Sequence, residues 1–207
     1  IQARAVIPAR TVEVLTENIS DMSRSGIEER SLKSGDRVPD FRLSSAGGQT
    51  VHLANLLARG PVVLSFFRGG WCPFCSLELD CLQRALPAIN DLGATLVAVS
   101  PETGESTSGT VEQHSLTFEV LSDPGNALAR QFGIVYHLQD EMQAIYKEFD
   151  LDLPTHNGDD SFDLPVPATY VIDTGGVIRV AFVDPDYTRR LDPVEILGTL
   201  RNLKDQP

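Results

Sequence analysis

The chain has 207 residues, 42% of them hydrophobic, and carries a formal net charge of −12 at pH 7. A chain of this length can bury one good hydrophobic core and still spare residues for an arm or an insertion. The acidic balance argues against binding to nucleic acid or to anionic membrane surfaces, since Lys and Arg carry that binding. No stretch of about 18 consecutive apolar residues occurs, so no transmembrane helix is expected.

Residues 1–33 are predicted to form an N-terminal helical arm ahead of the main domain. Val12, Leu15, Ile19 and Met22 recur among polar residues, which is typical of a helix with one apolar side. A docking or homodimer role for this arm is left open. The first ten residues do not resemble a secretory signal, although a chain that starts with Ile leaves room for a missing upstream segment.

Residues 34–207 are predicted to form one α/β domain with a mixed sheet, because strand-like and helix-like segments alternate along them. Glycine pairs mark two turns, one at Gly47-Gly48 and a strong hairpin signal at Asp173-Thr-Gly-Gly176. The expected elements, in chain order, are a hairpin within 38–53, a helix at 54–58, a strand at 62–67, a helix from Pro73, a strand at 95–100, a helix at 107–115, a strand at 118–121, a helix at 126–132, strands at 168–172 and 177–183, and a helix at 193–203.

The segment 136–165 is predicted to be an insertion in this domain. Its first part, 138–149, has a helical pattern, and an acidic loop with Gly and Pro follows. The spacing of the acidic residues fits no compact calcium loop, so a solvated loop is favoured. Because it leads into Pro165-Val-Pro167, the loop is expected to lie near the cysteines described next and to help select the substrate.

The most informative segment places cysteines where a buried strand gives way to a helix. The apolar run 62–67 is typical of a strand buried on both faces, and Gly69 and Gly70 permit a tight turn after it. Pro73 suits the first helical position, where its missing N–H costs nothing. Cys72 is therefore the predicted N-cap of the helix.

Cys72 and Cys75 together predict a redox site. A thiol attacks as its thiolate, and a helix N-terminus stabilises that anion, so the Cys72 sulfur is expected to point at the N–H groups of Phe74 and Cys75. Residues three apart share a helix face, so the pair can close a disulfide with little movement. A metal site is not expected, because no His lies at ligand spacing. A purely structural disulfide across so short a loop would gain little.

Residues around the pair have weaker assignments. Arg68 lowers a thiol pKa or holds an anionic substrate group, or else it is a surface arginine at a strand end. Trp71 is expected to cover the disulfide and to contribute to a docking surface. Glu78 is either a proton relay or an exposed helix residue. Cys81 is expected to be a buried, inert thiol, with a resolving role as the alternative.

Motifs in a fixed order from Ser34 to about Leu203 resemble the AhpC/TSA peroxiredoxin-like branch of the thioredoxin fold. They read GDRVPDF at 35–41, FFRGGWCPFC at 66–75, LVAVSP at 96–101, LSDP at 121–124 and PVPATYVID at 165–173, followed by GG. The resemblance implies a thioredoxin-like three-layer α/β/α sandwich with a mixed central sheet. It also implies an antioxidant oxidoreductase with a redox-active centre.

The chain departs from typical peroxiredoxins at this centre. Laid on their Pro-x-x-x-Thr-x-x-Cys signature, Cys75 takes the place of the peroxidatic cysteine, Cys72 that of the threonine and Arg68 that of the proline. Cys75-Ser-Leu-Glu78 is similar to the family's Cys-Thr-x-Glu. Pro167 stands where the family's peroxide-polarising arginine is expected, and it resembles the cis-proline that faces the dithiol of thioredoxins.

The two lines of argument favour different nucleophiles. Helix capping favours Cys72, whereas the resemblance to peroxiredoxins favours Cys75. Our hypothesis is that Cys72 attacks disulfides and that Cys75 is the better candidate for peroxide. Both routes end in a Cys72–Cys75 disulfide, because the neighbouring thiol resolves the attacked sulfur.

The sequence thus predicts a thiol-dependent oxidoreductase of the peroxiredoxin-like type that reduces peroxides or protein disulfides without a cofactor. A reductant of the thioredoxin or glutathione type would recycle it. The alternatives are a thioredoxin-like protein disulfide oxidoreductase without significant peroxidase activity, and a redox-sensing or binding module with little turnover. A reducing cytoplasm is the expected location, because two of the three cysteines are placed for reaction.

Overall fold

The computed structural model describes residues 8–205, and the first seven residues of the predicted arm lie outside that range. A mixed sheet forms the centre, with its strands in the order β2-β1-β5-β4-β3-β8-β9. Its strands are β1 (Arg42–Ser45), β2 (Thr50–His52), β3 (Val62–Phe66), β4 (Thr95–Ser100), β5 (Glu119–Ser122), β8 (Ala168–Ile172) and β9 (Ile178–Val183). Neighbours β3, β4 and β5 run parallel, whereas β8 is antiparallel to β3 and β9.

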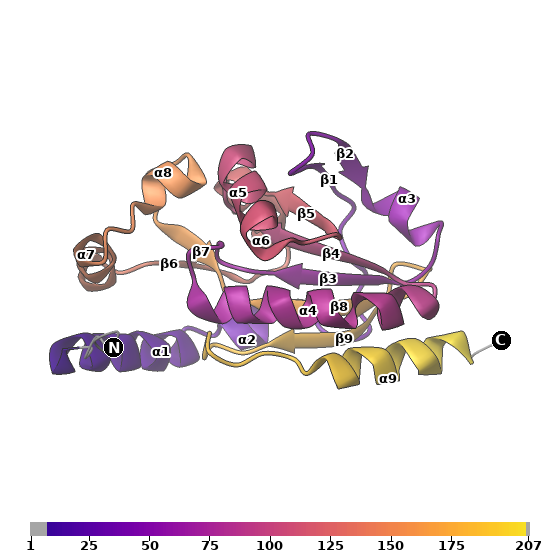
Figure 1. Cartoon of the computed structure of the whole chain (residues 1–207). Helices are drawn as coiled ribbons and strands as arrows, with labels where there is room; N and C mark the ends of the chain where they lie inside the picture. The colour runs from indigo at the N-terminus through magenta and orange to yellow at the C-terminus, as the bar shows by residue number, and fades with distance from the viewer. Residues whose placement is uncertain (1–7, 206–207) are drawn as a thin grey trace, which may run out of the picture.

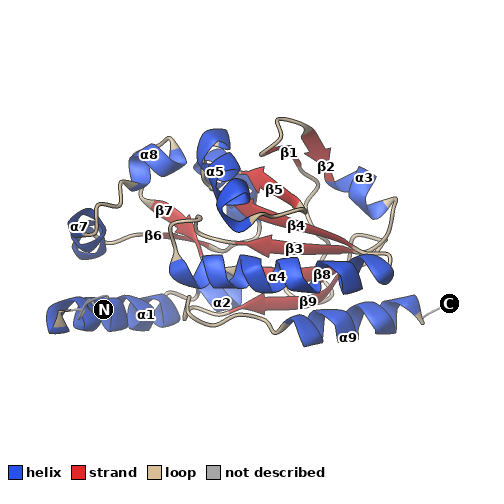
Figure 2. Cartoon of the chain, viewed as in Figure 1, coloured by secondary structure: helices blue, strands red, loops and turns tan. Residues whose placement is uncertain are grey.

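Helices cover both faces of this sheet, as Figure 2 shows. They are α1 (Ala9–Arg24), α2 (Ile27–Arg30), α3 (Leu53–Leu57), α4 (Pro73–Asp91), α5 (Gly104–His114), the 3₁₀ turn η1 (Pro124–Asn126), α6 (Ala127–Gln131), α7 (Asp140–Glu148), α8 (Leu153–Asn157) and α9 (Pro193–Lys204). The predicted three-layer α/β/α sandwich is confirmed. Among the described residues, no helix combines the length and the apolar character that crossing a bilayer requires.

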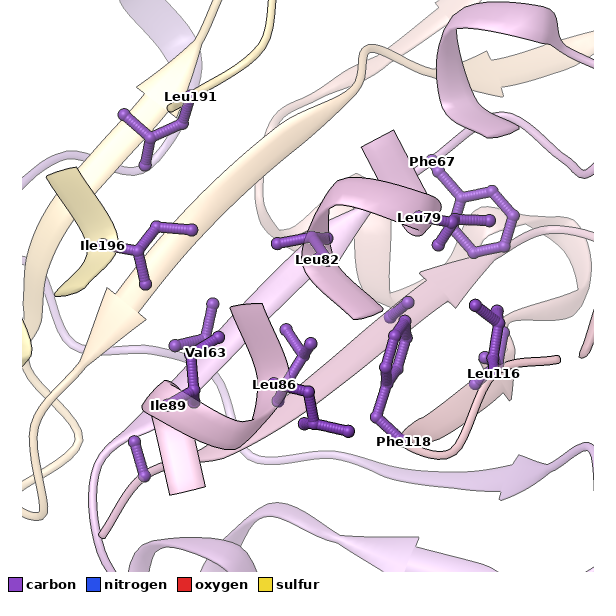
Figure 3. Packing of buried hydrophobic residues seen from close by; sticks show 14 of the residues in the cluster. Val63, Phe67, Leu79, Leu82, Leu86, Ile89, Leu116, Phe118, Leu191 and Ile196 are labelled. Carbon is purple, nitrogen blue, oxygen red and sulfur yellow. The ribbon is translucent and has the colours of Figure 1, made fainter. Parts of the chain in front are cut away.

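The alternation of side chains along β3 divides the interior into two cores. Val63 faces a core built from α4, α9 and the segment around Phe118, whose packing appears in Figure 3. Leu64 and Phe66 face the opposite core, which α3 and α6 cover. Every residue of β3 is buried, Ser65 included, as its almost wholly apolar run predicted, because both faces of the strand are covered.

The inserted segment is more regular than the sequence suggested. Its start and end pair as a separate antiparallel ribbon of β6 (Val135–His137) and β7 (Asp163–Pro165), with α7 and α8 between them. The stretch predicted as an acidic loop therefore contains a short helix and a strand. The acidic composition of this stretch gives no local signal for a strand, because β7 is stabilised by pairing with β6.

The arm packs against this insertion rather than standing apart. Met22 of α1 and Ile27 of α2 are buried in a third apolar core with Tyr146 of α7 and Leu153 of α8. In Figure 1 this unit lies at the end of the sheet where β3 ends and α4 begins. The third core is therefore adjacent to the two cysteines.

Candidate active site

Cys72 and Cys75 lie at the junction of β3 and α4, as the sequence predicted. Cys72 is the N-cap residue of α4, with extended backbone angles (φ −86°, ψ 117°), and Pro73 occupies the first turn. Both cysteines are free thiols and both are completely buried, at 0% exposure. Fixed groups of the protein, rather than water, therefore set their chemistry.

The Cys72 sulfur agrees only in part with the predicted capping. The side chain makes no full capping hydrogen bond, yet the backbone N–H of Cys75 is among the groups that lower the pKa of Cys72. In addition, Nη2 of Arg68 donates a hydrogen bond to Cys72 Sγ at 3.0 Å. The partner of the sulfur is thus a full positive charge from the preceding loop, which stabilises a thiolate more strongly than a peptide dipole does.

Arg68 is a buried arginine, not a surface residue at a strand end. Only 3% of it is exposed, and its Nη1 donates to the hydroxyl of Tyr146 at 3.0 Å. The guanidinium lies 4.1 Å from the ring centre of Tyr187 and 5.2 Å from that of Trp71. These aromatic rings hold the cation beside the sulfur through cation–π contacts and exclude water from it.

The two thiols differ in acidity. The hydrogen bond from Cys75, followed by the charge and hydrogen bond of Arg68, lowers the pKa of Cys72 from 9.0 to about 5 against the effect of burial. Burial, together with the neighbouring Cys72, raises the pKa of Cys75 well above its usual value. At neutral pH the pair therefore consists of a Cys72 thiolate that accepts a hydrogen bond from the Cys75 thiol.

A buried ion pair supports the second cysteine. Glu78 is 7% exposed, so it is not the exposed helix residue considered above, and its carboxylate accepts hydrogen bonds from Nε of Arg190 and from Oγ1 of Thr169. The same Arg190 donates from Nη2 to Cys75 Sγ at 3.4 Å. Burial raises the pKa of Glu78 to about 7 in spite of Arg190. Near neutral pH this carboxylate can therefore accept or release a proton beside Cys75.

Sequence reasoning missed Arg190 completely. The residue lies in the loop between β9 and α9, far along the chain from the cysteines, and neighbours no recognisable motif. Arg190 brings a guanidinium to Cys75. The strand position where the family's arginine was expected holds Pro167 instead. Only the antiparallel packing of β9 beside β8 places that loop over the start of α4.

Pro167 departs from the predicted thioredoxin-like geometry. Pro167 is buried and lies just before β8, whose first residue, Ala168, pairs with Phe66 at the end of β3. The cysteine loop begins at this same end of β3. The described residues contain no cis peptide bond, so the bond before Pro167 is trans. The resemblance to the cis-proline of thioredoxins is therefore wrong in conformation.

The surface around the pair corrects the prediction for Cys81. Beside it, Leu77 is 59% exposed and Phe74 is 41% exposed. Cys81 is only half-buried and lines a groove of about 420 Å³ together with Leu77 and Arg190. Cys81 is thus not the fully buried thiol that its leucine neighbours suggested, because its side of α4 faces the loop before α9 rather than the sheet.

A cleft of about 740 Å³ lies beside Trp71, and its wall combines polar and apolar residues. Its wall includes the buried Glu102, whose Oε1 accepts a hydrogen bond from the Gly70 N–H at 3.2 Å. His156 of α8 approaches the same oxygen at 3.8 Å. Burial raises the pKa of Glu102. Trp71 itself packs edge-on against Tyr146, with ring centres 5.5 Å apart, so it separates the cleft from Arg68.

Gly70 fixes the cysteine loop, and adding one methyl group there tests this role. A Cβ at this position would lie 2.2 Å from Oγ1 of Thr110 in α5, so Gly70→Ala must displace either the loop or the buried Thr110 side chain. We expect a loss of about 1–3 kcal/mol in unfolding free energy. Alkylation of Cys72 by iodoacetamide at pH 7 should also slow several-fold, because Arg68 shifts with the loop.

Two variants control the Gly70→Ala measurement. Gly198→Ala in α9 adds the same methyl group where no atom lies within 4 Å, and its alkylation rate should match that of the parent protein. Adding Thr110→Ala to Gly70→Ala removes the Oγ1 clash and should restore part of the lost rate. Unchanged alkylation in Gly70→Ala would contradict a positioning role for this close approach.

No metal centre accompanies this arrangement: within residues 8–205, nowhere do three or more His, Cys, Asp or Glu side chains gather as ligands. The groups that surround the sulfurs are two guanidinium ions, a carboxylic acid and aromatic rings. Such an environment supports thiolate chemistry, in which one sulfur attacks and its neighbour resolves the product.

Comparisons with known proteins agree with this chemistry. A Mycobacterium tuberculosis protein named as a peroxiredoxin is 30% identical over 103 residues, which make up 50% of this chain and 67% of that protein. The thiol-disulfide oxidoreductase ResA of Bacillus thuringiensis is 26% identical over 109 residues, or 52% of this chain and 62% of ResA. The crystal structure of peroxidoxin BcpB from Mycobacterium tuberculosis superposes with a TM-score of 0.66, covers 83% of this chain and 98% of its own, and is 24% identical, so it supports the fold.

The pattern of the AhpC/TSA family matches residues 34–181, a range that contains the cysteine loop, α4 and the strand after Pro167. The start of this range coincides with the start of the resemblance noted in the sequence. The chain therefore belongs to the AhpC/TSA family and is a thiol-dependent oxidoreductase of the peroxiredoxin-like type.

Proposed function

We propose that this enzyme reduces peroxides through a cycle in which Cys72 attacks and Cys75 resolves. The observation that carries the proposal is the buried hydrogen bond from Arg68 to Cys72 Sγ, which holds a thiolate at the start of α4. In the first step the thiolate attacks a peroxide oxygen, so an S–O bond forms and the O–O bond breaks. The leaving hydroxide or alkoxide takes a proton, and Cys72 becomes a sulfenic acid.

The second step uses the other half of the site. The charge of the Cys72 thiolate contributes to the raised pKa of Cys75, and that contribution disappears once Cys72 is a neutral sulfenic acid. Cys75 then gives its proton to Glu78 and attacks the Cys72 sulfur. The S–S bond forms, the sulfenic hydroxyl leaves, and the returning proton converts it to water. Burial keeps the pKa of Cys75 high throughout, so its proton must be taken by a neighbouring base, and one site then performs attack and resolution.

A kinetic experiment tests the proposed peroxide reduction. Trp71 is the single tryptophan of the chain and its ring lies 5.2 Å from Arg68, so its fluorescence should report the state of Cys72. Reduced enzyme is mixed with hydrogen peroxide in a stopped-flow instrument, and the product is analysed by mass for the Cys72–Cys75 disulfide. A rate no greater than that of a free thiol would refute a peroxidase role.

Glu78→Gln should slow the resolving step specifically. Because the pKa of Glu78 is about 7, disulfide formation in the parent enzyme should accelerate as pH rises through about 7. Glutamine cannot accept the proton, so we expect a slower step, by about 100-fold, without this pH dependence. Trapping with dimedone should then show accumulated Cys72 sulfenic acid. The exposed Glu195→Gln serves as the control, and a pH profile in Glu78→Gln identical to that of the parent would contradict the relay.

Reduction of protein disulfides is a second candidate activity. The half-exposed Phe74 and the exposed Leu77 provide an apolar surface beside the buried cysteines, which suits docking of a polypeptide. The similarity to ResA, which is named a thiol-disulfide oxidoreductase, supports thiol–disulfide exchange by this chain. Reduction of insulin disulfides by the pre-reduced enzyme tests it, and rapid peroxide reduction without any insulin reduction would exclude it.

Three further assignments belong to this proposal. We infer a reductant of the thioredoxin or glutathione type, since a disulfide must be reduced to complete each turnover. The reducing cytoplasm is the proposed location, because the site works from free thiols. A homodimer through the arm is also proposed, on the basis of the exposed side chain of Val12 in α1, and sedimentation analysis tests it.

A further inference from the structure

The buried cation Arg68 has an unusual set of neighbours. Among residues 8–205 it forms no ion pair with an Asp or Glu side chain, whereas Arg190 pairs with Glu78. The groups whose charges act on it are Tyr146, Tyr136, Cys72 and Cys75. Burial raises the pKa of both tyrosines above the usual value, so they stay neutral at pH 7. The Cys72 thiolate is therefore the counter-charge of Arg68.

Oxidation removes this counter-charge. When Cys72 and Cys75 form a disulfide, the thiolate becomes a neutral sulfur and Arg68 stays buried and charged. A buried charge that loses its partner is strongly destabilising. A disulfide that closes so short a loop offers little entropic compensation, because the loop-closure gain grows with loop length. The folded protein should therefore be more stable in the reduced state than in the oxidised state.

We propose that the Cys72–Cys75 pair is an oxidising couple and that low-molecular-weight monothiols of the glutathione class reduce it directly. The inference rests on the proposed disulfide cycle. It adds that the disulfide form is a strong oxidant, and it names the class of the reductant. A pair whose reduced form is stabilised by the protein has a high reduction potential, so a weak reductant is sufficient. A dedicated low-potential dithiol protein is then not required for turnover.

The reduction proceeds by two thiol–disulfide exchanges. A first monothiolate attacks the Cys72 sulfur, the Cys72–Cys75 bond breaks, and Cys75 leaves and takes up a proton. A second monothiolate attacks the sulfur of the bound monothiol, and Cys72 leaves as the thiolate beside Arg68. Two monothiols lose two electrons to give one small disulfide, and the enzyme gains them. The low pKa of Cys72 makes it a good leaving group in the second exchange.

Equilibration with glutathione tests the proposal. Enzyme oxidised with diamide is incubated in buffers of defined reduced and oxidised glutathione at pH 7, quenched with acid and analysed by mass. We expect an equilibrium constant for reduction at least about 100-fold larger than that of thioredoxin measured alongside. Arg68→Met should lower this constant at least tenfold, and Arg68→Lys should retain most of it. Arg179→Met, which removes a β9 arginine paired with Asp173 of the preceding turn, is the control and should leave this constant unchanged.

A second measurement on the parent protein does not depend on the variants folding. Urea unfolding at pH 8 should occur at higher urea for the reduced protein than for the oxidised protein. Because the pKa of folded Cys72 lies below its unfolded value of 9.0, its stabilisation is complete above pH 9 and disappears as pH falls through about 5. The advantage of the reduced protein should shrink over that window. Greater stability of the oxidised protein at pH 8 would overturn the inference.

The outcomes separate this inference from the proposed function. If peroxide or diamide produces no Cys72–Cys75 disulfide, the cycle itself fails and the inference fails with it. If the disulfide forms but its equilibrium with glutathione equals that of thioredoxin, the cycle stands and only the oxidising couple is refuted. An equal constant in Arg68→Met and in the parent would likewise refute the role of Arg68.

Discussion

Cys72→Ser is expected to abolish the reaction of the reduced enzyme with peroxides and disulfides at pH 7. The variant keeps Cys81, which lies outside the redox pair, and Cys75, whose pKa is held well above 9.0 by burial. Such a thiol is ionised to about 1% or less at pH 7, so the rate should fall by about 100-fold or more. Cys75→Ser should instead react once at nearly the parental rate and then stop, because the resolving thiol is absent and Cys81 lies on a different face of α4.

Trapping identifies the attacking sulfur directly. After one equivalent of hydrogen peroxide, dimedone should label Cys72 in the Cys75→Ser variant and leave the Cys72→Ser variant unlabelled. An excess of a mixed-disulfide reagent should give the same contrast. Faster labelling of Cys75 in Cys72→Ser would show that the family signature, which aligns Cys75 with the peroxidatic cysteine, identifies the nucleophile for peroxide. It would confirm the half of the sequence hypothesis that concerns peroxide.

Arg68→Met is expected to have the second-largest effect, by making the Cys72 thiol less acidic. In the parent, alkylation should rise with pH through a midpoint near 5. Losing an adjacent positive charge should move that midpoint upward by about one to two units, while the hydrogen bond from Cys75 remains. At pH 5.5 the alkylation rate should then drop about tenfold, and at pH 9 the two proteins should react alike.

The matched variant Arg68→Lys distinguishes charge from packing. Lysine retains a positive charge but cannot make the planar contacts of the guanidinium with the rings of Tyr187 and Trp71. If charge controls acidity, its alkylation profile should stay close to that of the parent. A midpoint near 5 in Arg68→Met, measured with iodoacetamide from pH 4 to 9, would contradict the role assigned to this arginine.

The sequence predicted the framework of the site because local patterns determine it. The apolar run of β3, the glycine turn and Pro73 each have a local physical reason, and each lies where the pattern placed it. The hairpin of β8 and β9 was likewise predicted, since Asp173 and the glycines after it define its turn. Helix and strand boundaries of this kind depend on neighbours in the sequence.

The electrostatics of the site could not be predicted in the same way. Glu78 is buried because it pairs with Arg190, which lies 112 residues further along the chain in the loop before α9. Arg68 is buried because Tyr146 of the insertion and Tyr187 close over it. The exposure of Leu77 also depends on which elements pack nearby. These features depend on tertiary contacts, for which a single sequence contains no local signal.

The contact between Arg68 and Tyr146 has a consequence for how the enzyme can vary. The family pattern begins at residue 34, yet Tyr146 is held by α7, which packs on α1 from the arm. The chemistry of the cysteine loop is therefore coupled to two segments that lie outside the strands and helices of the central sandwich. Relatives that share the sandwich but replace either segment would keep the cysteines and change their acidity. Differences in reactivity within the family can thus arise without any substitution at the sulfurs themselves.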